Sequence, residues 1–423
     1  MQNFSVDSNI PFLVDILNDA TPVIASEAWQ STVLTNRLPR LTARNAEKNV
    51  VSKNQRTVNM FSNGEITNRQ LIDSKTNFLI VRSNAKVNRE LLEGTNVEFV
   101  ATATTGFEHI DTEYLKQNKI KFFAASGANS NSVAEYTIFS ILLWAKKNNF
   151  SELQNKKVGI IGFGNIGSKV AKYLDFMKIK YLICDPFVEE NYFCNPSLRA
   201  KSEAISVNKN RLPHLTARND GLGKVFCDVD AVIENCEIIT VHTPLTFDGN
   251  HPTFNLLNEN RINKIKNNSL LISAARGEIC DEKAMINRKN ELDFAIDVWE
   301  NEPVISNREL LATSLLATPH IAGHSFQGKL NATVMIAKHL NEFYKMDLDL
   351  SEISEKICLK NPFEKSEMTD YFSLFEALNK SRELLKTSSE MKQNSKLENE
   401  KFKQFFNTVR LNYPKYFEIL DFV

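Results

Sequence analysis

The chain has 423 residues, of which 42% are hydrophobic, and its 51 basic and 51 acidic side chains leave a formal net charge of zero. This length and composition predict two or three domains with hydrophobic cores. The even charge disfavours electrostatic binding of nucleic acid or membranes, so we expect neither partner. The first twenty residues contain early acids and no long apolar run, which predicts neither a signal peptide nor a membrane anchor.

The predicted elements alternate between short apolar strands and amphipathic helices. Continuous apolar strands are typical of parallel sheets buried on both faces, which indicates a doubly wound α/β fold. A long, mostly buried helix is predicted at Ser130–Asn148, with Ser130 or Asn131 as its N-cap. After about Lys345 the pattern changes to amphipathic helices rich in Phe, Lys and Glu, which indicates a separate C-terminal module. The predicted strands are Asn77–Ser83, Val97–Thr104, Lys157–Gly164, Tyr181–Pro186, Glu237–Thr243, Ser269–Ala275 and Asp293–Trp299.

The cysteines are scattered, with no Cys-x-x-Cys pair in the sequence. This distribution is typical of reduced thiols in a cytoplasmic protein. We therefore expect no metal site and no disulfide. The six residues are Cys184, Cys194, Cys227, Cys236, Cys280 and Cys358.

A Gly-x-Gly-x-x-Gly turn follows one predicted strand and opens a helix. The first glycine permits the tight turn, the second lets the backbone approach a pyrophosphate, and the third lets helix and strand pack closely. Asp185, at the end of the next strand, can accept hydrogen bonds from the adenosine ribose and would repel the extra phosphate of NADP. We therefore predict NAD as cofactor; the alternative is a turn that binds no nucleotide, with Asp185 as a cap. The predicted contacts in the turn are Gly162, Gly164, Asn165, Ile166 and Gly167.

Three further polar residues fall near strand ends, where ligands bind in open α/β sheets. His320 has the chemistry to take the hydroxyl proton of a 2-hydroxy acid near neutral pH. A neighbouring carboxylate, Glu302, would stabilise the imidazolium and orient the ring. Arg276 can bind the substrate carboxylate and polarise the developing carbonyl. Taken singly, each residue has a structural alternative. His320 could be a structural histidine after proline, Glu302 an acid at a helix start and Arg276 a member of a surface ion pair.

These motifs together resemble the D-2-hydroxyacid dehydrogenase family over about Val6 to Lys329. Segments such as VRSNAKVN, FVATATTGFEHID, HTPLTFDGNHPTFNLL and HIAGHSFQGK carry this resemblance, and VRS, TAT and HTPLTFDG within them together indicate its phosphoerythronate branch. That branch usually has a tyrosine where this chain has His324. The resemblance implies that Arg276 and Glu302 are catalytic, with His320 as proton donor or acceptor. It also implies cofactor contacts by Asp185, Thr243, Ala274, Ala275, Arg276, Asp297 and Gly323, and substrate contacts by Ser83, Thr104 and His324.

The same resemblance implies two doubly wound parallel-sheet domains, a Rossmann cofactor domain inserted into a flavodoxin-like substrate domain, plus a small C-terminal dimerisation module. A cytoplasmic homodimer would then oxidise 4-phospho-D-erythronate to 2-oxo-3-hydroxy-4-phosphobutanoate with NAD, a step towards pyridoxal phosphate. The expected boundaries are 1–128 for the substrate domain, 129–321 for the NAD-binding domain, 322–345 for a helix returning to the substrate domain and 346–423 for the dimerisation module.

A decapeptide occurs twice, at Asn36–Asn45 and Asn210–Asn219, with nine of its ten positions identical. Two distant copies do not make a solenoid, which needs at least three. Both copies lie in sequence that the family pattern lacks, about 21–56 and about 200–224. Loop closure costs only about 0.6 kcal/mol per doubling of length, so we interpret both regions as tolerated insertions that form solvated loops or short irregular helices. A duplicated binding motif is the alternative.

Three alternatives to the implied activity stay open. Another member of the same family would act on a substrate of the phosphoglycerate or hydroxypyruvate type. A catalytically idle NAD-sensing regulator would be expected to lose one of the three polar residues Arg276, Glu302 and His320, and all are present. A relic that no longer folds would fail to give soluble protein that binds NAD.

Overall fold

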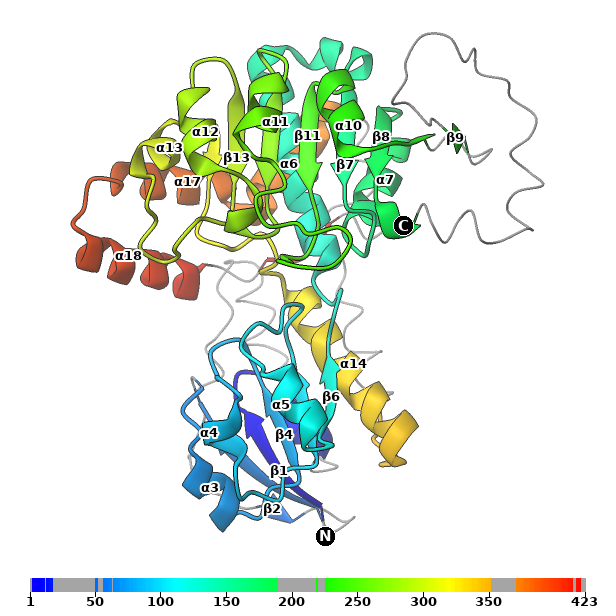
Figure 1. The fold of residues 1–423 in the computed structure, drawn as a ribbon, viewed down its shortest axis with the longest axis vertical. Helices are drawn as coiled ribbons and strands as arrows, with labels where there is room; N and C mark the ends of the chain where they lie inside the picture. The colour runs from blue at the N-terminus through cyan, green and yellow to red at the C-terminus, as the bar shows by residue number, and fades with distance from the viewer. Residues whose placement is uncertain are drawn as a thin grey trace. The chain divides into compact units, whose positions relative to one another are not determined.

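The computed structural model of the chain describes residues 2–11, 13–17, 50–51, 56–62, 64–188, 218–219, 225–350, 370–413 and 416–419. The chain divides into two compact units: Met1–Asn129, His324–Asn361 and Pro414–Glu418 form the first, and Ser130–Gly323, Pro362–Tyr413 and Ile419–Val423 form the second. Each unit is an α/β domain built on a largely parallel sheet (Figure 1), which confirms the predicted fold class. No described helix is long and apolar enough to cross a membrane.

The first unit has a sheet of strand order β2-β3-β1-β4-β5-β6, in which β2 alone runs antiparallel to its neighbour. The five parallel strands therefore follow the flavodoxin-like order 2-1-3-4-5. The strands are β1 (Gln2–Asp7), β2 (Val50–Val51), β3 (Arg56–Phe61), β4 (Phe78–Val81), β5 (Phe99–Thr102) and β6 (Lys121–Ala124), and the helices are α1 (Leu13–Leu17), α3 (Asn68–Asp73), α4 (Arg89–Leu92), α5 (Thr112–Gln117) and α14 (Phe326–Tyr344).

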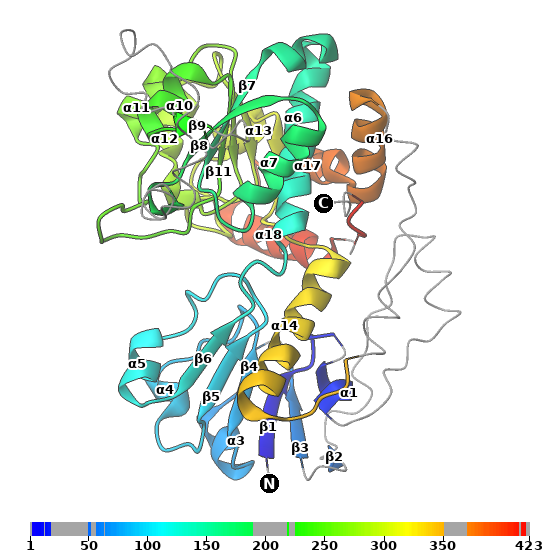
Figure 2. The same cartoon turned by 90° about the vertical axis from the view of Figure 1, so that its right-hand side faces the viewer.

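Successive side chains of the first sheet enter two different apolar layers, as the alternation of strand side chains requires. Phe78 and Ile80 of β4 pack in the layer that contains α1 and α14, whereas Leu79 and Val81 pack with α3, α4 and α5. Figure 2 shows the two sets of helices on opposite faces of this sheet. The helix α14 is the one predicted at 322–345, and its N-cap Ser325 accepts a hydrogen bond from the amide of Gly328.

The second unit has a sheet of order β14-β13-β12-β11-β7-β8-β10-β9, parallel except for β9. From β10 to β14 the seven parallel strands follow the chain order 3-2-1-4-5-6-7, which is the order 3-2-1-4-5-6 of dinucleotide-binding domains with one strand added. Its strands are β7 (Lys157–Ile161), β8 (Lys180–Cys184), β9 (Arg218–Asn219), β10 (Val225–Phe226), β11 (Ile238–Val241), β12 (Leu270–Ser273), β13 (Asp293–Ile296) and β14 (Leu316–Ala317). Its helices are α6 (Ser130–Asn148), η1 (Phe150–Asn155), α7 (Gly167–Phe176), α10 (Val229–Asn235), α11 (Glu259–Lys264), η2 (Gly277–Ile279), α12 (Glu282–Asn287), α13 (Arg308–Thr313), α16 (Tyr371–Arg382), α17 (Leu384–Gln393) and α18 (Asn399–Asn412).

The C-terminal helices share the hydrophobic core of the second unit. Met391 of α17 and Phe402 and Phe406 of α18 are buried in the same cluster as side chains of β11, β12 and β13. On α16, Phe375 stacks on Phe139 of α6 with ring centroids 5.3 Å apart. Residues 370–413 therefore pack as part of the second unit.

The long helix α6 has the predicted bounds, but its first turn differs from the prediction. The helix begins at Ser130, so Ser130 and Asn131 lie inside the first turn, and neither occupies the N-cap position. Most of the two predicted insertions lies outside the described residues, as do Cys194 and Cys358. The described parts form short antiparallel edge strands, β2 beside β3 and β9 beside β10.

Candidate active site

The glycine turn of the second unit has the geometry that a dinucleotide requires. Gly162 has φ +92°, and a Cβ there would lie 2.8 Å from the carbonyl carbon of His242. A Cβ on Gly167 would lie 2.0 Å from the carbonyl oxygen of Gly162, whereas a Cβ on Gly164 meets no atom within 4 Å. The backbone at Gly164 is therefore open to a ligand. The helix α7 begins directly after Ile166, which provides no side-chain cap for the first turn. The Ser168 amide donates to the Gly164 carbonyl at 3.1 Å, and the positive end of the helix dipole there favours a pyrophosphate.

Asp185 lies at the end of β8 and contacts the glycine turn directly. One carboxylate oxygen accepts a hydrogen bond from the amide of Phe163 at 2.7 Å. The other accepts from the amides of Phe187 and Val188 at 3.1 and 3.2 Å. These bonds fix the carboxylate beside the turn, where the predicted ribose contact would place it.

The ends of β11 and β12 carry the next predicted cofactor residues. Thr243 follows β11, and its buried hydroxyl has no hydrogen-bond partner among the described residues. A buried polar group of this kind indicates a ligand or water that completes it. Ala274 and Ala275 follow β12 and are buried, at 8% and 9% exposure. This orphaned hydroxyl and the open backbone at Gly164 fit a bound NAD.

His320 and Glu302 form a close pair in the same unit. The Nδ1 atom of His320 lies 2.8 Å from Oε2 of Glu302, and the Oε1 atom accepts a hydrogen bond from the amide of Trp299 at 2.7 Å. Burial acts to raise the pKa of Glu302, but the charge and hydrogen bond of His320 and the Trp299 amide outweigh it and leave the pKa below its ordinary value. The His320 side chain is 35% exposed, and because Nδ1 faces Glu302, Nε2 is the ring nitrogen left for a substrate.

Asp297 is placed where it holds the turn that carries His320. This carboxylate at the end of β13 is 1% exposed. It accepts hydrogen bonds from the Thr318 hydroxyl at 2.6 Å and from the amides of Ile321 and Ala322 at 2.8 Å each. The amide of His320 donates to the main-chain oxygen of Asp297 at 2.8 Å. His320 itself has φ +56°, in the left-handed region.

Arg276 follows β12, and its segment lies against the segment of Glu302. The Arg276 guanidinium donates to the carbonyl of Ala275 at 2.8 Å. A Cβ on the next residue, Gly277, would lie 2.3 Å from the carbonyl carbon of Trp299. This close approach brings the backbone of Arg276 beside the loop of residues 299–302, so one end of the sheet presents Arg276, Glu302 and His320.

A buried acid that the sequence did not indicate supports the loop of Glu302. Glu282 accepts hydrogen bonds from the amide of Glu300 at 2.7 Å and from the side chain of Asn307 at 3.1 Å. Burial raises the pKa of Glu282 to about 7. Its position at the start of a helix is an ordinary one for an acid, which explains why the sequence alone did not single it out.

The first unit places the predicted substrate residues at the ends of adjacent strands. Ser83 follows β4 and is exposed, and Thr104 follows β5. The Thr104 hydroxyl lies 2.7 Å from that of Thr102, which in turn lies 3.1 Å from Nε2 of His109. Burial lowers the pKa of His109. His324 and Gly323 stand on either side of the division between the units. No group of three or more potential metal ligands occurs among the described residues.

Comparison with known proteins gives related sequences over most of the chain. Residues 135–220 and 197–322 match the D-isomer specific 2-hydroxyacid dehydrogenase, NAD binding domain family. Erythronate-4-phosphate dehydrogenase of Bacteroides thetaiotaomicron is 34% identical over 364 residues, 84% of this chain and 89% of that protein. The enzyme of the same name from Wigglesworthia glossinidia brevipalpis is 38% identical over 63% of this chain and 62% of its own length. That from Chromohalobacter salexigens is 39% identical over 61% and 60%.

Solved structures share the fold at low sequence identity. D-lactate dehydrogenase from Aquifex aeolicus, complexed with NAD and lactic acid, has a TM-score of 0.55 and 21% identity over 84% of this chain and 98% of that one. NAD⁺-bound 3-phosphoglycerate dehydrogenase of Entamoeba histolytica has a TM-score of 0.54 and 21% identity, with 83% and 98% coverage. The second unit is therefore an NAD-binding domain of the 2-hydroxyacid dehydrogenase type.

Proposed function

Because the chain belongs to the erythronate-4-phosphate dehydrogenase family, we propose that it oxidises 4-phospho-D-erythronate with NAD to 2-oxo-3-hydroxy-4-phosphobutanoate, towards pyridoxal phosphate. The chain spans about three fifths of the length of the Wigglesworthia and Chromohalobacter relatives and 89% of the Bacteroides one. The observation that carries the proposal is the His320–Glu302 pair at 2.8 Å in an NAD-binding unit. A base of this kind is what the oxidation of a hydroxyl group requires.

The chemistry assigned to the pair is proton transfer at Nε2 of His320. NAD, when bound, would accept the hydride from C2; the part of His320 is to take the proton of the C2 hydroxyl at Nε2 as the carbonyl forms. The imidazolium that results carries its second proton on Nδ1, in a hydrogen bond to the Glu302 carboxylate. The lowered pKa of Glu302 keeps that carboxylate charged and acceptor-only near neutral pH. In the reverse direction His320 returns the proton.

The other site residues receive roles that suit their positions. Arg276 binds the substrate carboxylate through its guanidinium, and Ser83, Thr104 and His324 contact the substrate. NAD, when bound, supplies the hydride acceptor. The residues that would hold it are Gly162, Gly164, Asn165, Ile166, Gly167, Asp185, Thr243, Ala274, Ala275, Arg276, Asp297 and Gly323. Since the Asp297 carboxylate accepts three protein hydrogen bonds, its contribution to the cofactor would come through the turn it holds.

The domain organisation that we propose is the one that the family resemblance implies. Residues 1–128 and the helix at 322–345 form the substrate domain, and 129–321 the NAD-binding domain. Residues 346–423 contribute to a homodimer, and the protein acts in the cytoplasm on a small phosphorylated 2-hydroxy acid. Sedimentation of the purified protein tests the dimer.

The activity is tested by NADH formation with 4-phosphoerythronate, 3-phosphoglycerate and D-glycerate as substrates. We expect the highest kcat/KM for 4-phosphoerythronate. A preference for 3-phosphoglycerate or D-glycerate would reassign the substrate within the family. His320→Ala should reduce kcat at least about a hundredfold, the low end for lost acid–base catalysis. The matched control is His339→Ala, which removes a histidine stacked on Phe123 in the first unit. Near-normal turnover in His320→Ala would remove this residue from the mechanism.

A further inference from the structure

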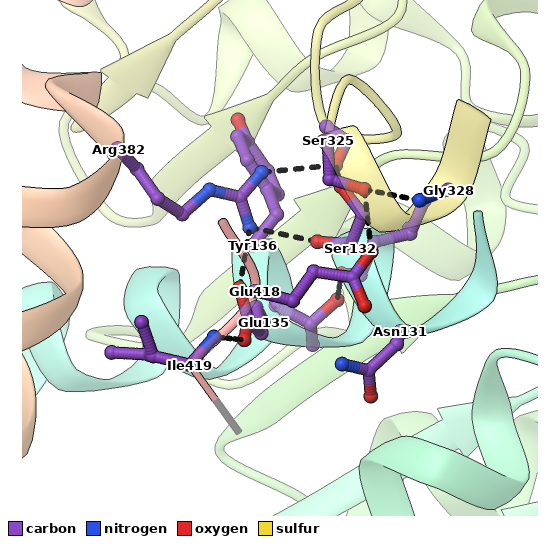
Figure 3. A network of polar contacts seen from close by, with 12 residues as sticks. Asn131, Ser132, Glu135, Tyr136, Ser325, Gly328, Arg382, Glu418 and Ile419 are labelled. Atoms are coloured by element: carbon purple, nitrogen blue, oxygen red, sulfur yellow. Dashed lines mark hydrogen bonds and ion pairs between the residues drawn. The ribbon is translucent and has the colours of Figure 1, made fainter. Parts of the chain in front are cut away.

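A fully buried arginine of the C-terminal helices reaches the turn that carries the proposed catalytic histidine. Arg382 is the last residue of α16, and its side chain is 0% exposed. Its guanidinium donates from Nη1 to the carbonyl of Ser132 at 2.7 Å (Figure 3) and from Nη2 to the carbonyl of Ala322 at 2.9 Å. Arginine is almost never buried to this degree without partners, so these contacts need an explanation.

The carbonyl of Ala322 accepts a second hydrogen bond, from the Ser132 hydroxyl at 2.6 Å. On the other side of the same backbone, the amides of Ile321 and Ala322 donate to Asp297 at 2.8 Å each. The Asp297 carboxylate therefore binds the N–H groups of Ile321 and Ala322, the two residues after His320. The Arg382 guanidinium and the Ser132 hydroxyl bind the C=O group of Ala322. Hydrogen bonds thus fix both polar groups of this backbone segment.

The positive charge of Arg382 is compensated locally. Nη1 lies 4.0 Å from Oε2 of Glu135, which is also fully buried. The Oε1 atom of Glu135 accepts from the amide of Ile419 at 2.6 Å. The ring of Tyr136 lies 5.8 Å from the guanidinium carbon, within cation–π range. Tyr413 donates its hydroxyl proton to the carbonyl of Arg382.

The packing of α16 against α6 does not require the buried guanidinium of Arg382. The helix is anchored on α6 by the stack of Phe375 on Phe139 and by the burial of Leu374 and Leu378. When both members of a buried ion pair are replaced by hydrophobic side chains of similar volume, stability is often unchanged or increased. A guanidinium at this position is thus poorly explained by stability, and its two hydrogen bonds go to the start of α6 and to the segment next to His320.

We propose that Arg382 is a positioning residue for His320, so that the C-terminal helices take part in catalysis as well as in packing. It acts through the Ala322 carbonyl and keeps the imidazole at the distance and angle that proton transfer needs. This inference rests on the proposed role of His320 as the proton-transfer group. Displacement of a reacting group by about 1 Å can cost a hundredfold in rate, so a small relaxation of the turn is sufficient.

The test compares Arg382→Met with Arg288→Met. Arg288 also donates to main-chain carbonyls of the second unit, those of Ile262 and Ile265, in part-buried hydrogen bonds. Among the described residues, Arg288 makes no hydrogen bond to residues 320–322. We expect Arg382→Met to lower kcat about tenfold to a hundredfold, with the Kd for NAD and the KM for 4-phosphoerythronate within about twofold of wild type. Arg288→Met should lower thermal stability and leave kcat unchanged.

Two further variants keep the inference testable if Arg382→Met does not fold. Arg382→Lys retains a charge that can reach one of the two carbonyls and should restore part of kcat. Ser132→Ala removes only the hydroxyl on the Ala322 carbonyl and should lower kcat in the same way but less. Folded Arg382→Met or Ser132→Ala enzyme with wild-type kcat would overturn the positioning role. An active His320→Ala would instead overturn the proposed function itself.

Discussion

Two substitutions in the glycine turn, Gly164→Ala and Gly167→Ala, should have different effects on NAD binding and on stability. In Gly167→Ala the new Cβ would lie 2.0 Å from the main-chain oxygen of Gly162 and 3.1 Å from Cγ2 of Ile160. Ordinary contact begins at 3.4 Å, so the methyl group intrudes by more than 1 Å on backbone that cannot rotate away. In Gly164→Ala the methyl group meets no protein atom within 4 Å.

The magnitudes follow from these distances. Overpacking of a tight site costs about 1 to 3 kcal/mol, and each kcal/mol lowers Tm by about 2 to 4 °C in a domain of this size. We therefore expect Gly167→Ala to lower the Tm of the NAD-free protein by several degrees. Gly164→Ala should leave that Tm within about 1 °C of wild type, since a compatible Gly→Ala change is neutral or mildly stabilising. Its methyl group lies where the backbone approaches the pyrophosphate, so the Kd for NAD should rise tenfold or more, about 1.4 kcal/mol.

The assay is thermal unfolding with and without NAD, together with calorimetric titration of NAD. Saturating NAD should raise the Tm of Gly164→Ala clearly less than that of wild type at the same concentration, because ligand stabilisation depends on the ratio of concentration to Kd. Wild-type NAD affinity in Gly164→Ala would refute the placement of the pyrophosphate, and wild-type stability of Gly167→Ala would refute the packing argument.

Three other predictions concern acids of the second unit. Asp185→Ala should narrow the preference for NAD over NADP, because a like charge no longer faces the 2′-phosphate; an unchanged ratio of the two kcat/KM values would show that the carboxylate lies elsewhere. Glu302→Gln should lower kcat at least about tenfold, since the amide cannot stabilise the imidazolium of His320; NADH formation at saturating substrate measures it, and an unchanged kcat would contradict the pair's role. Burial raises the pKa of Glu282 from 4.5 to about 7, so the stability it contributes is present below pH 4.5 and is lost as pH rises to 7. The Tm of Glu282→Gln minus that of wild type should therefore increase between pH 4.5 and pH 7. A Tm difference that stays constant over this pH range would contradict the raised pKa of Glu282.

The parts of this molecule that the sequence could predict are those whose signals are local. The glycine turn, the acid eighteen residues beyond it and the bounds of α6 depend on residues close in the chain. The His320–Glu302 pair could be predicted because both follow strands of one parallel sheet, whose ends meet at one edge. The composition change near Lys345 falls at the end of α14, at Tyr344, whereas the first described helix of the C-terminal segment, α16, begins at Tyr371.

Other features depend on contacts between distant residues and leave no local pattern. Arg382 reads as an ordinary basic residue in the last turn of a helix, and its partners Ser132 and Ala322 are 250 and 60 residues away. Asp297 follows a strand, as a cofactor contact would, yet its hydrogen bonds to Thr318, Ile321 and Ala322 exist only once β13 and β14 are paired. Periodicity and motif spacing carry no information about such partners.

The discontinuous first unit has a consequence for how the chain folds during synthesis. Residues up to Asn129 provide the whole sheet of this unit, but one apolar layer is completed by Leu330, Ile336 and Leu340 of α14. Until these residues leave the ribosome, Phe78 and Ile80 have no α14 to pack against, and an exposed apolar face of this kind favours aggregation or chaperone binding. The hydrophobic core of the second unit is also completed late in synthesis, because it includes Phe402 and Phe406 of α18. The first unit therefore reaches its final packing only after α14 has been made, and the second only after α18.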